Sequence, residues 1–289
     1  MGSNPTPSAT KPAPNEGFWP SLLRTIVNAN DSILQFYERL AASYHLIFGN
    51  WREAVLRQGE ILDKLIREQL GDKKPLTILD CSCGIGTQAI GLALRGYRVH
   101  ATDLSPAQIE RAKQQADTFG ARLTFGIADM RALESQVEGR FDIAISCDNS
   151  LPHLLTRDDL SKALRNIHAK IHPVGLFIAS IRDYDRIVED HPRVDQPRIL
   201  EGPEGKRIVF QVWDWSSDGI SYTAHLFILR EAGGEWHVAH YATPYRALLR
   251  QELDEILESS GFSKIRWHMP SESGYYQPIV ASRTQSVAS

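Results

Sequence analysis

The sequence predicts an α/β fold in which a mostly parallel sheet is sandwiched by helices. The first observation is that apolar, strand-like runs alternate with helix-like runs between residues 76 and 181. Connections through helices make successive strands parallel. The second is the segment 78–88, which reads Ile-Leu-Asp-Cys-Ser-Cys-Gly-Ile-Gly-Thr-Gln and leads from an apolar strand through a glycine-bearing turn into a helix. This order builds the nucleotide pocket of a Rossmann-like sheet.

Four zones follow one another along the chain. Residues 1–17 are rich in Pro, Ser, Thr and Asn and are expected to be a disordered tail. Residues 18–71 are expected to be helical because apolar side chains recur at one-face spacing. The α/β core is expected over residues 72–185 and 246–284, with a small inserted antiparallel β subdomain over residues 186–245.

The expected elements follow from these patterns in chain order. The core strands are expected at 76–81, 98–102, 123–128, 141–147, 175–181, 265–268 and 277–283, and the core helices at 88–95, 106–118, 157–169 and 246–259. The inserted strands are expected at 207–215, 221–229 and 236–241. These last runs alternate apolar with polar residues and are separated by Asp-Gly and Gly-Gly, which are hairpin turn signals.

The glycine-bearing turn indicates which nucleoside is bound. Gly84 and Gly86 are not followed by the third glycine of a dinucleotide fingerprint, and no Lys or Arg stands between residues 77 and 94 to meet a phosphate. Asp80 places a negative charge at the turn, and Asp103 ends the next strand, where a carboxylate takes ribose hydroxyls. An acid beside the pocket favours a cationic ligand. S-adenosylmethionine, with its adenosine, sulfonium and ammonium groups, fits this polarity better than NAD or ATP.

The spacing of these residues resembles a known signature. Asp80, Gly84 and Gly86, followed by Asp103, resemble the motif of class I S-adenosylmethionine-dependent methyltransferases, and Asp129 closes a further strand-like run in the expected order. The resemblance implies a terminal antiparallel strand pair in the sheet. It also implies that the N-terminal helical segment is a lid over the pocket.

Three further motifs resemble the glycine and glycine/sarcosine N-methyltransferase branch. They are Asp-Asn-Ser-Leu-Pro-His-Leu at 148–154, Ser-Ile-Arg-Asp-Tyr-Asp at 180–185 and Tyr-Glu-Arg-Leu-Ala at 37–41. Glycine N-methyltransferases of this kind carry Arg-Asn-Tyr-Asp within the second motif, whereas this chain has Asp183 in place of the Asn. Because Asp183 adds a charge, the identity of the acceptor stays open.

The resemblance implies a set of cofactor contacts. The backbone at residues 81–84 is expected to face the methionine moiety and Asp80 its ammonium group, while Asp103 takes the ribose hydroxyls. Asp129 is expected to accept from the adenine amino group. The residues expected to bind the cofactor are Asp80, Cys81, Ser82, Cys83, Gly84, Gly86, Asp103, Leu104, Asp129 and Met130.

The same motifs imply acceptor contacts. Arg182 is expected to bind the carboxylate of the acceptor as a planar fork, and Asn149 to orient the acceptor's polar group. The alternative for Arg182 is a salt bridge to Asp183 or Asp185, and for Asn149 a turn-forming amide.

Aromatic residues and one histidine complete the candidate set. Tyr37 and Tyr44 lie one helical face apart in the lid, where they are expected to exclude water and touch the sulfonium; core packing is the alternative. His153 follows the strand that carries Asn149 and is a candidate proton acceptor, with a structural role as the alternative. The aromatic residues of the inserted sheet either line an acceptor pocket or pack the sheet.

Composition narrows the class of partner. The net charge of −3 and the pI near 6.4 give no basic field for nucleic acid, so a small-molecule acceptor is favoured. Neither a membrane-spanning run nor a signal pattern is found, and a cytoplasmic location is expected. The three cysteines, two of them in Cys81-Ser82-Cys83, suit neither a disulfide framework nor a zinc site, so no metal is expected.

The sequence thus predicts an S-adenosylmethionine-dependent methyltransferase that acts on a small molecule. The expected reaction is in-line N-methylation of an amino acid or related amine that bears an anionic group. O- or S-methylation of a small metabolite, a cofactor-binding module without transfer activity, and a protein methyltransferase stay open as alternatives, as does homo-oligomer formation.

Overall fold

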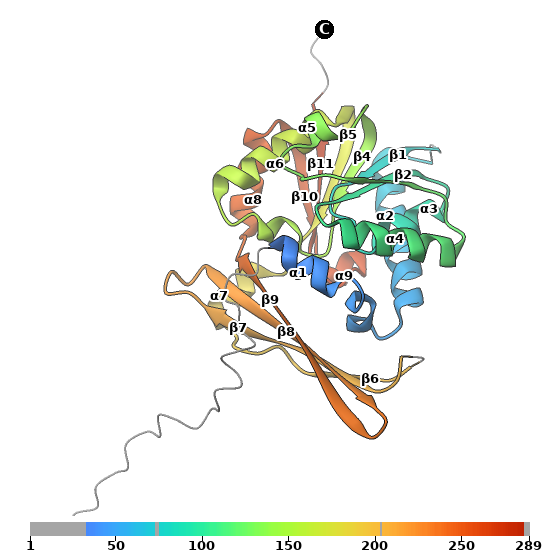
Figure 1. Ribbon diagram of the computed structural model, residues 1–289. Coiled ribbons are helices and arrows are strands. Elements are labelled where there is room, and N and C mark those ends of the chain that lie inside the picture. Colours follow the sequence, from blue (N-terminus) through green and yellow to red (C-terminus); the bar gives the residue numbers. More distant parts are fainter. Residues whose placement is uncertain (1–32, 73–74, 203, 286–289) are drawn as a thin grey trace, which may run out of the picture. The chain divides into compact units, whose positions relative to one another are not determined.

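The computed structural model describes residues 33–72, 75–202 and 204–285. The tail expected at residues 1–17 and the first part of the expected helical segment lie outside these residues. The described strands form a seven-stranded sheet and a separate four-stranded sheet. Helices lie on both faces of the larger sheet (Figure 1). In the described part of the chain, no helix is both long and apolar enough to cross a membrane.

The seven-stranded sheet has the order β10-β11-β5-β4-β1-β2-β3. Its first five strands in sequence pair in parallel, β11 is antiparallel to β5, and β10 is antiparallel to β11. The expected parallel core and terminal antiparallel pair are therefore confirmed. The strands are β1 (Thr77–Asp80), β2 (Arg98–Asp103), β3 (Thr124–Ile127), β4 (Phe141–Ser146), β5 (Ile171–Ser180), β10 (Phe262–His268) and β11 (Ile279–Thr284).

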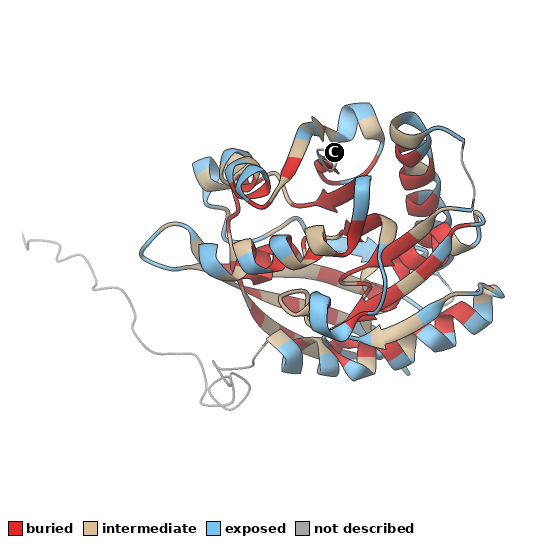
Figure 2. Ribbon diagram, turned by 90° about the horizontal axis from the view of Figure 1, so that it is seen from above, coloured by how far each residue is buried: buried red, intermediate tan, exposed pale blue. Residues whose placement is uncertain are grey.

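Helices cover both faces of this sheet. Ile78 packs in the layer under α2, α3 and α4, whereas its neighbour Leu79 packs in the layer under α5, α6 and α8. The helices are α2 (Trp51–Leu70), α3 (Thr87–Ala93), α4 (Pro106–Phe119), α5 (Leu133–Gln136), α6 (Arg157–Ala169) and α8 (Arg250–Ser259). Because both faces are covered, the central strands are buried, and the exposed residues gather on the outer helix faces (Figure 2).

Local sequence sets the helix boundaries. Asn50, Ser105 and Thr156 each accept a hydrogen bond from a backbone N–H in the first turn of α2, α4 and α6. The α2 and α3 backbones approach so closely that a Cβ on Gly59 would lie 2.6 Å from the carbonyl carbon of Gly91. Glycine is therefore required where these two helices touch.

The N-terminal segment forms three pieces in the described residues. They are α1 (Ile33–Leu40), the 3₁₀ helix η2 (Tyr44–Ile47) and α2, in place of a longer continuous helical stretch. Phe36, Leu40 and Leu46 pack against Val209 and Leu226 of the four-stranded sheet. The apolar face of α1 is thus buried against this sheet.

The four-stranded sheet has the order β6-β7-β8-β9, with all neighbours antiparallel. Its strands are β6 (Arg198–Leu200), β7 (Arg207–Trp215), β8 (Ser221–Ala232) and β9 (Glu235–Arg246). β8 and β9 extend to the turn at Gly233 and Gly234, both of which have positive φ, so the two strands are longer than the expected runs.

Several elements differ from the expectation. The helix expected from residue 246 begins at Arg250, because Pro244 and Arg246 still pair with β8. β5 begins at Ile171, since the irregular backbone around Val174, with a φ of 59°, is incorporated in the strand. Like α5, the short helices η3 (Leu151–His153), α7 (Tyr184–Asp190) and α9 (Pro270–Ser273) are not among the expected elements.

Candidate active site

The turn after β1 is held by a carboxylate of the next strand. Gly84, with a φ of 52°, donates its N–H to Asp103 Oδ2 at 2.8 Å, and the N–H of Ser105 donates to Asp103 Oδ1 at 3.0 Å. A Cβ on Gly84 would lie 3.2 Å from the ring of Tyr44. The bare backbone of the turn and Asp103 are therefore brought to one place, as the sequence predicts.

Asp80 is a buried carboxylate with one oxygen unsatisfied. Its Oδ1 accepts from the Ser82 N–H at 3.2 Å, but its Oδ2 has no hydrogen-bond partner among the described residues. Burial raises the pKa of Asp80 to about 8. A cationic group of a ligand, in direct contact or through water, would satisfy this oxygen and favour its ionised form.

The first cavity lies at the carboxyl ends of β1, β2, β3 and β4 and has a volume of about 540 Å³. Parallel α/β sheets bind ligands at this edge. Two of the expected residues, Asp80 and Gly86, are not among those that line the cavity. The expected residues that line the cavity are Tyr37, Tyr44, Cys81, Ser82, Cys83, Gly84, Asp103, Leu104, Asp129, Met130 and His153.

Carboxylates dominate the charge of this cavity. Asp103, Asp129, Asp148 and Asp159 line it, and among the described lining residues Arg131 alone carries a fixed positive charge. Arg131 is itself neutralised by ion pairs to Asp129 at 2.7 Å and Asp159 at 3.2 Å. The donor set fits a sulfonium and an ammonium group and opposes a pyrophosphate. In the described part of the chain, no group of three or more His, Cys, Asp or Glu side chains is placed to hold a metal ion.

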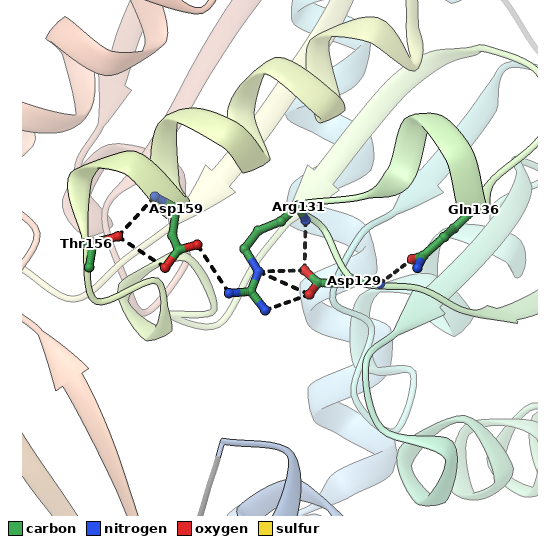
Figure 3. A network of polar contacts seen from close by, with 5 residues as sticks. All are labelled: Asp129, Arg131, Gln136, Thr156 and Asp159. Carbon is green, nitrogen blue, oxygen red and sulfur yellow. Dashed lines mark hydrogen bonds and ion pairs between the residues drawn. The ribbon is translucent and has the colours of Figure 1, made fainter.

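Figure 3 shows that Asp129 is engaged more fully than the sequence indicates. The guanidinium of Arg131 contacts both carboxylate oxygens of Asp129, and it also reaches Asp159, whose carboxylate accepts from the Thr156 hydroxyl at 3.1 Å. Burial opposes the ionised form of Asp129, but the Arg131 hydrogen bonds prevail and lower its pKa. Any contact from Asp129 to an adenine amino group would therefore be shared with Arg131.

Tyr37 of α1 is hydrogen-bonded to His153. The Tyr37 hydroxyl lies 2.7 Å from Nε2 of His153, and His153 Nδ1 lies 3.2 Å from the Pro244 carbonyl oxygen. Because a carbonyl only accepts, Nδ1 carries the proton and Nε2 accepts from Tyr37. Burial lowers the pKa of His153 to about 3, so the ring is neutral. With both ring nitrogens engaged, His153 has the geometry of a structural residue.

Helix α1 is attached to the beginning of α4. The Glu38 carboxylate accepts from the Ser105 hydroxyl at 2.5 Å and from the Ala107 N–H at 3.1 Å. Gln108 Nε2 donates to the Tyr37 carbonyl oxygen at 2.8 Å. These contacts hold α1 at the first turn of α4, next to Asp103.

A second cavity of about 1010 Å³ contains the expected acceptor residues Asn149 and Arg182. The Arg182 guanidinium donates to the Tyr222 hydroxyl and to Gln211 Oε1, both at 2.9 Å, and lies 4.9 Å from the ring centroid of Trp213. Aromatic residues of the four-stranded sheet therefore form the wall behind this charge.

The alternative salt bridge for Arg182 is wrong. Asp183 and Asp185 pair with Arg250, at 2.7 Å and 3.4 Å. Asn149 has a φ of 68°, accepts from the Arg182 N–H at 3.0 Å and donates to Tyr184 at 3.0 Å. Asn149 thus fixes the backbone from which Arg182 projects.

Three residues line both cavities, namely Tyr37, Tyr44 and Asp148. They mark the boundary between the two cavities. Sequence reasoning identified the two tyrosines but missed Asp148, although its position at the carboxyl end of β4, beside Asn149, was a usable signal. It also missed Arg131 and Glu38, whose partners are set by tertiary packing.

Comparisons with known proteins agree with this geometry. A family model described as a methyltransferase domain matches residues 78–175, which extend from β1 into β5. The chain is 30% identical over 190 residues to the glycine/sarcosine N-methyltransferase of Parasynechococcus marenigrum (strain WH8102), a match that covers 63% of this chain and 66% of that protein. It is also 30% identical over 187 residues to YqeM of Bacillus subtilis (strain 168), named provisionally as a methyltransferase, with 64% of this chain and 72% of that protein covered. The chain belongs to the S-adenosylmethionine-dependent methyltransferases.

The methyltransferase spans only part of some relatives. It covers 66% of the Parasynechococcus protein, just under two thirds, and 52% of a glycine/sarcosine N-methyltransferase of Aphanothece halophytica. Its fold is similar to that of CalS10, an amino pentose methyltransferase from Micromonospora echinaspora solved with bound S-adenosylmethionine. The TM-score is 0.65 at 17% identity, over 88% of this chain and 99% of that chain. At this identity the likeness concerns the fold.

Proposed function

We propose that this methyltransferase methylates the nitrogen of a small amine that also carries an anionic group. The observation that carries the proposal is the charge of Arg182, which lines the second cavity. Its two terminal nitrogens bond to neutral oxygens, those of Tyr222 and Gln211. In the described ranges, no carboxylate lies within ion-pair distance of it.

A positive charge in an aromatic surround favours an anionic partner. The Trp213 and Tyr245 rings lie 4.9 Å and 5.2 Å from the guanidinium carbon, which restricts access of water to it. A carboxylate, or another planar anion of the acceptor, is the partner that a guanidinium binds best. The anionic group of the acceptor is therefore assigned to Arg182, and its amine to the boundary between the cavities.

The size of the second cavity argues for an acceptor larger than glycine. Its volume of about 1010 Å³ is at the upper end of the range of roughly 300–1,000 Å³ for small-molecule sites. Asp183 lines the cavity but is bound to Arg250, so the residue that departs from the related motif does not neutralise Arg182. Relatives named for glycine and sarcosine and a fold neighbour named for an amino pentose are consistent with an amine acceptor.

The residues of the chain position the acceptor and provide the charges that bind it. When bound, S-adenosylmethionine supplies an electrophilic methyl group on sulfur. Tyr37 and Tyr44 flank the boundary and exclude water there, while Arg182 and the neighbouring wall hold the acceptor. Holding the nucleophile in line supplies most of the acceleration in such a displacement.

A panel of matched acceptors tests this proposal. The purified full chain is incubated with S-adenosylmethionine and glycine, sarcosine, β-alanine or phenylalanine, and with the corresponding decarboxylated amines and hydroxy acids; methylated products are detected by mass spectrometry. We expect turnover of amines that carry the carboxylate and at least tenfold lower kcat/KM for their decarboxylated partners. Methylation of the hydroxy acids alone, or equal turnover with and without the carboxylate, would overturn the proposal.

A further inference from the structure

The boundary between the two cavities contains a carboxylate with no assigned role. Of the three residues that line both cavities, Tyr37 and Tyr44 present aromatic rings and Asp148 a carboxylate. A methyl group that passes from a donor in the first cavity to an acceptor in the second must cross this boundary. Asp148 is therefore beside the atoms that react.

The backbone holds Asp148 in an unusual conformation. Its φ is 59° and that of the next residue, Asn149, is 68°, although neither residue is glycine. The N–H of Asp148 donates to the Ser180 hydroxyl at 2.8 Å, and that of Asn149 donates to the Ser180 carbonyl oxygen at 3.0 Å. Two successive left-handed residues are costly and persist at functional sites when the surroundings fix them. Here β5 fixes them.

Asp148 is surrounded by neutral groups and one other acid. The Tyr275 hydroxyl donates to its Oδ1 at 2.6 Å, and Tyr276 and Gln88 also face it. Tyr44 and Asp80 approach it from η2 and β1. No cationic side chain in the described residues pairs with it.

The second cavity thus has the Asp148 carboxylate where it borders the first cavity and the Arg182 guanidinium elsewhere in its lining. Asp148 and Arg182 both line this cavity, and neither forms an ion pair with another described residue. A molecule that bears an ammonium and an anionic group complements both charges. Neutral or purely anionic acceptors would leave Asp148 without a positively charged partner.

We propose that Asp148 binds the ammonium group of the acceptor and removes one of its protons before methyl transfer. This rests on the proposed function. The Asp148 carboxylate takes a proton from the ammonium, leaving a neutral amine and a carboxylic acid. The nitrogen lone pair then forms the N–C bond, the C–S bond breaks, and its electron pair returns to sulfur. The carboxylic acid finally loses its proton to water, so one proton is released for each methyl group transferred.

The environment of Asp148 suits this role. A protonated amine has no lone pair with which to attack, so a base is needed below the pKa of the amine. Burial raises the pKa of Asp148, bringing it nearer to neutral pH, while the Tyr275 hydrogen bond opposes this rise. The carboxylate is thus a stronger base than an exposed aspartate.

The test compares the pH dependence of wild type with that of Asp148→Asn. The amide keeps an oxygen for the Tyr275 hydroxyl and removes only the charge. The probe is the amino acid from the panel that the wild type methylates fastest, at saturating S-adenosylmethionine. We expect kcat/KM to fall roughly a hundredfold near pH 7. The difference in kcat/KM between the variant and the wild type should shrink as the pH approaches the acceptor's own pKa, because free amine then needs no base. The cofactor Kd of the variant should stay within a few-fold of the wild-type value.

Two further variants serve as a control and a second probe. Asp254→Asn alters a carboxylate that lies outside both cavities, also has a raised pKa and accepts from the Trp267 indole N–H at 2.8 Å, so its pH profile should match the wild type. Tyr275→Phe removes the donor that stabilises the Asp148 carboxylate, so the acid limb of the pH profile should move to higher pH. This second variant tests the inference even if Asp148→Asn does not fold.

The outcomes separate the two proposals. If the wild type methylates amines and Asp148→Asn keeps wild-type kcat/KM, or loses a constant factor at every pH, the role of Asp148 is overturned and the proposed function stands. An unmoved acid limb in Tyr275→Phe would also overturn that role. If the wild type methylates no amine, both proposals are overturned.

Discussion

Replacing Asp80 by asparagine should raise the unfolding free energy of the cofactor-free protein and weaken cofactor binding. Asp80 is buried at the end of β1, with one carboxylate oxygen lacking a partner in the described structure. Asparagine resembles the protonated carboxyl in shape and keeps an oxygen for the Ser82 N–H. The substitution therefore removes the cost of ionising this buried group.

The magnitude follows from the pKa. Burial raises the pKa of Asp80 from 3.8 to about 8, a difference of about four units. Each unit corresponds to about 1.4 kcal/mol, so the contribution to the unfolding free energy reaches up to about 6 kcal/mol. Because the folded pKa is the higher one, this contribution is present below pH 4 and is lost as the pH rises to about 8. Wild type should therefore lose stability relative to Asp80→Asn across that window.

Urea unfolding from pH 4 to pH 8.5, with and without S-adenosylmethionine, measures both effects. Without cofactor, the two proteins should be closest in stability near pH 4, and the variant should gain several kcal/mol by pH 8. With cofactor the difference should narrow by about 1.5–3 kcal/mol, because the variant lacks the charge-assisted contact to the ammonium group and its Kd is raised roughly ten- to hundredfold. A stability difference that does not change with pH would refute the reasoning about burial, and an unchanged Kd would refute the ammonium contact.

Four further substitutions test other parts of the site. Asp103→Ala should raise the cofactor Kd roughly tenfold or more with the far-ultraviolet circular dichroism retained, and unchanged calorimetric binding would contradict the ribose assignment. Arg182→Lys should raise the acceptor KM at least tenfold and leave the cofactor Kd unchanged, because lysine lacks the planar fork; an equal KM would argue against anion binding there. His153→Gln should leave the shape of the pH–rate profile intact between pH 5 and 9, since the pKa of His153 is lowered to about 3, and loss of a limb would restore His153 as a proton acceptor. Glu38→Ala should speed cofactor dissociation several-fold in stopped-flow measurements, because two hydrogen bonds that hold α1 are removed, whereas an unchanged rate would show that the lid is held by apolar packing alone.

The parts of the fold that local sequence determines could be predicted. The β1 turn, with Gly84 and Asp103, follows from an apolar run, two glycines and an acid at the end of the next strand. α6 was expected at 157–169 and occupies Arg157–Ala169, because Thr156 provides a cap and the apolar spacing is regular. Periodicity and capping are properties of neighbouring residues, so one sequence suffices to read them.

Contacts between distant segments could not be read in this way. The Arg182 hydrogen bonds to Gln211 and Tyr222 require the docking of the four-stranded sheet, which no local pattern specifies. The same holds for Asp148 with Tyr275, separated by 127 residues. The beginning of α8 was misjudged because the pairing of β9 with β8 outweighs the helical pattern at Arg246. Each of these depends on tertiary packing.

The close approach of α2 and α3 has a consequence for variation far from the reaction. A methyl group added at Gly91 would sit 2.4 Å from the Val55 carbonyl oxygen, and one at Gly59 would meet the Gly91 backbone, so either alanine substitution would force the two helices apart. α3 starts at the turn that faces the first cavity, whereas Arg57 and Gln58 of α2 line the second. Alanine at either glycine would thus change the spacing between donor and acceptor without removing any polar group of the site.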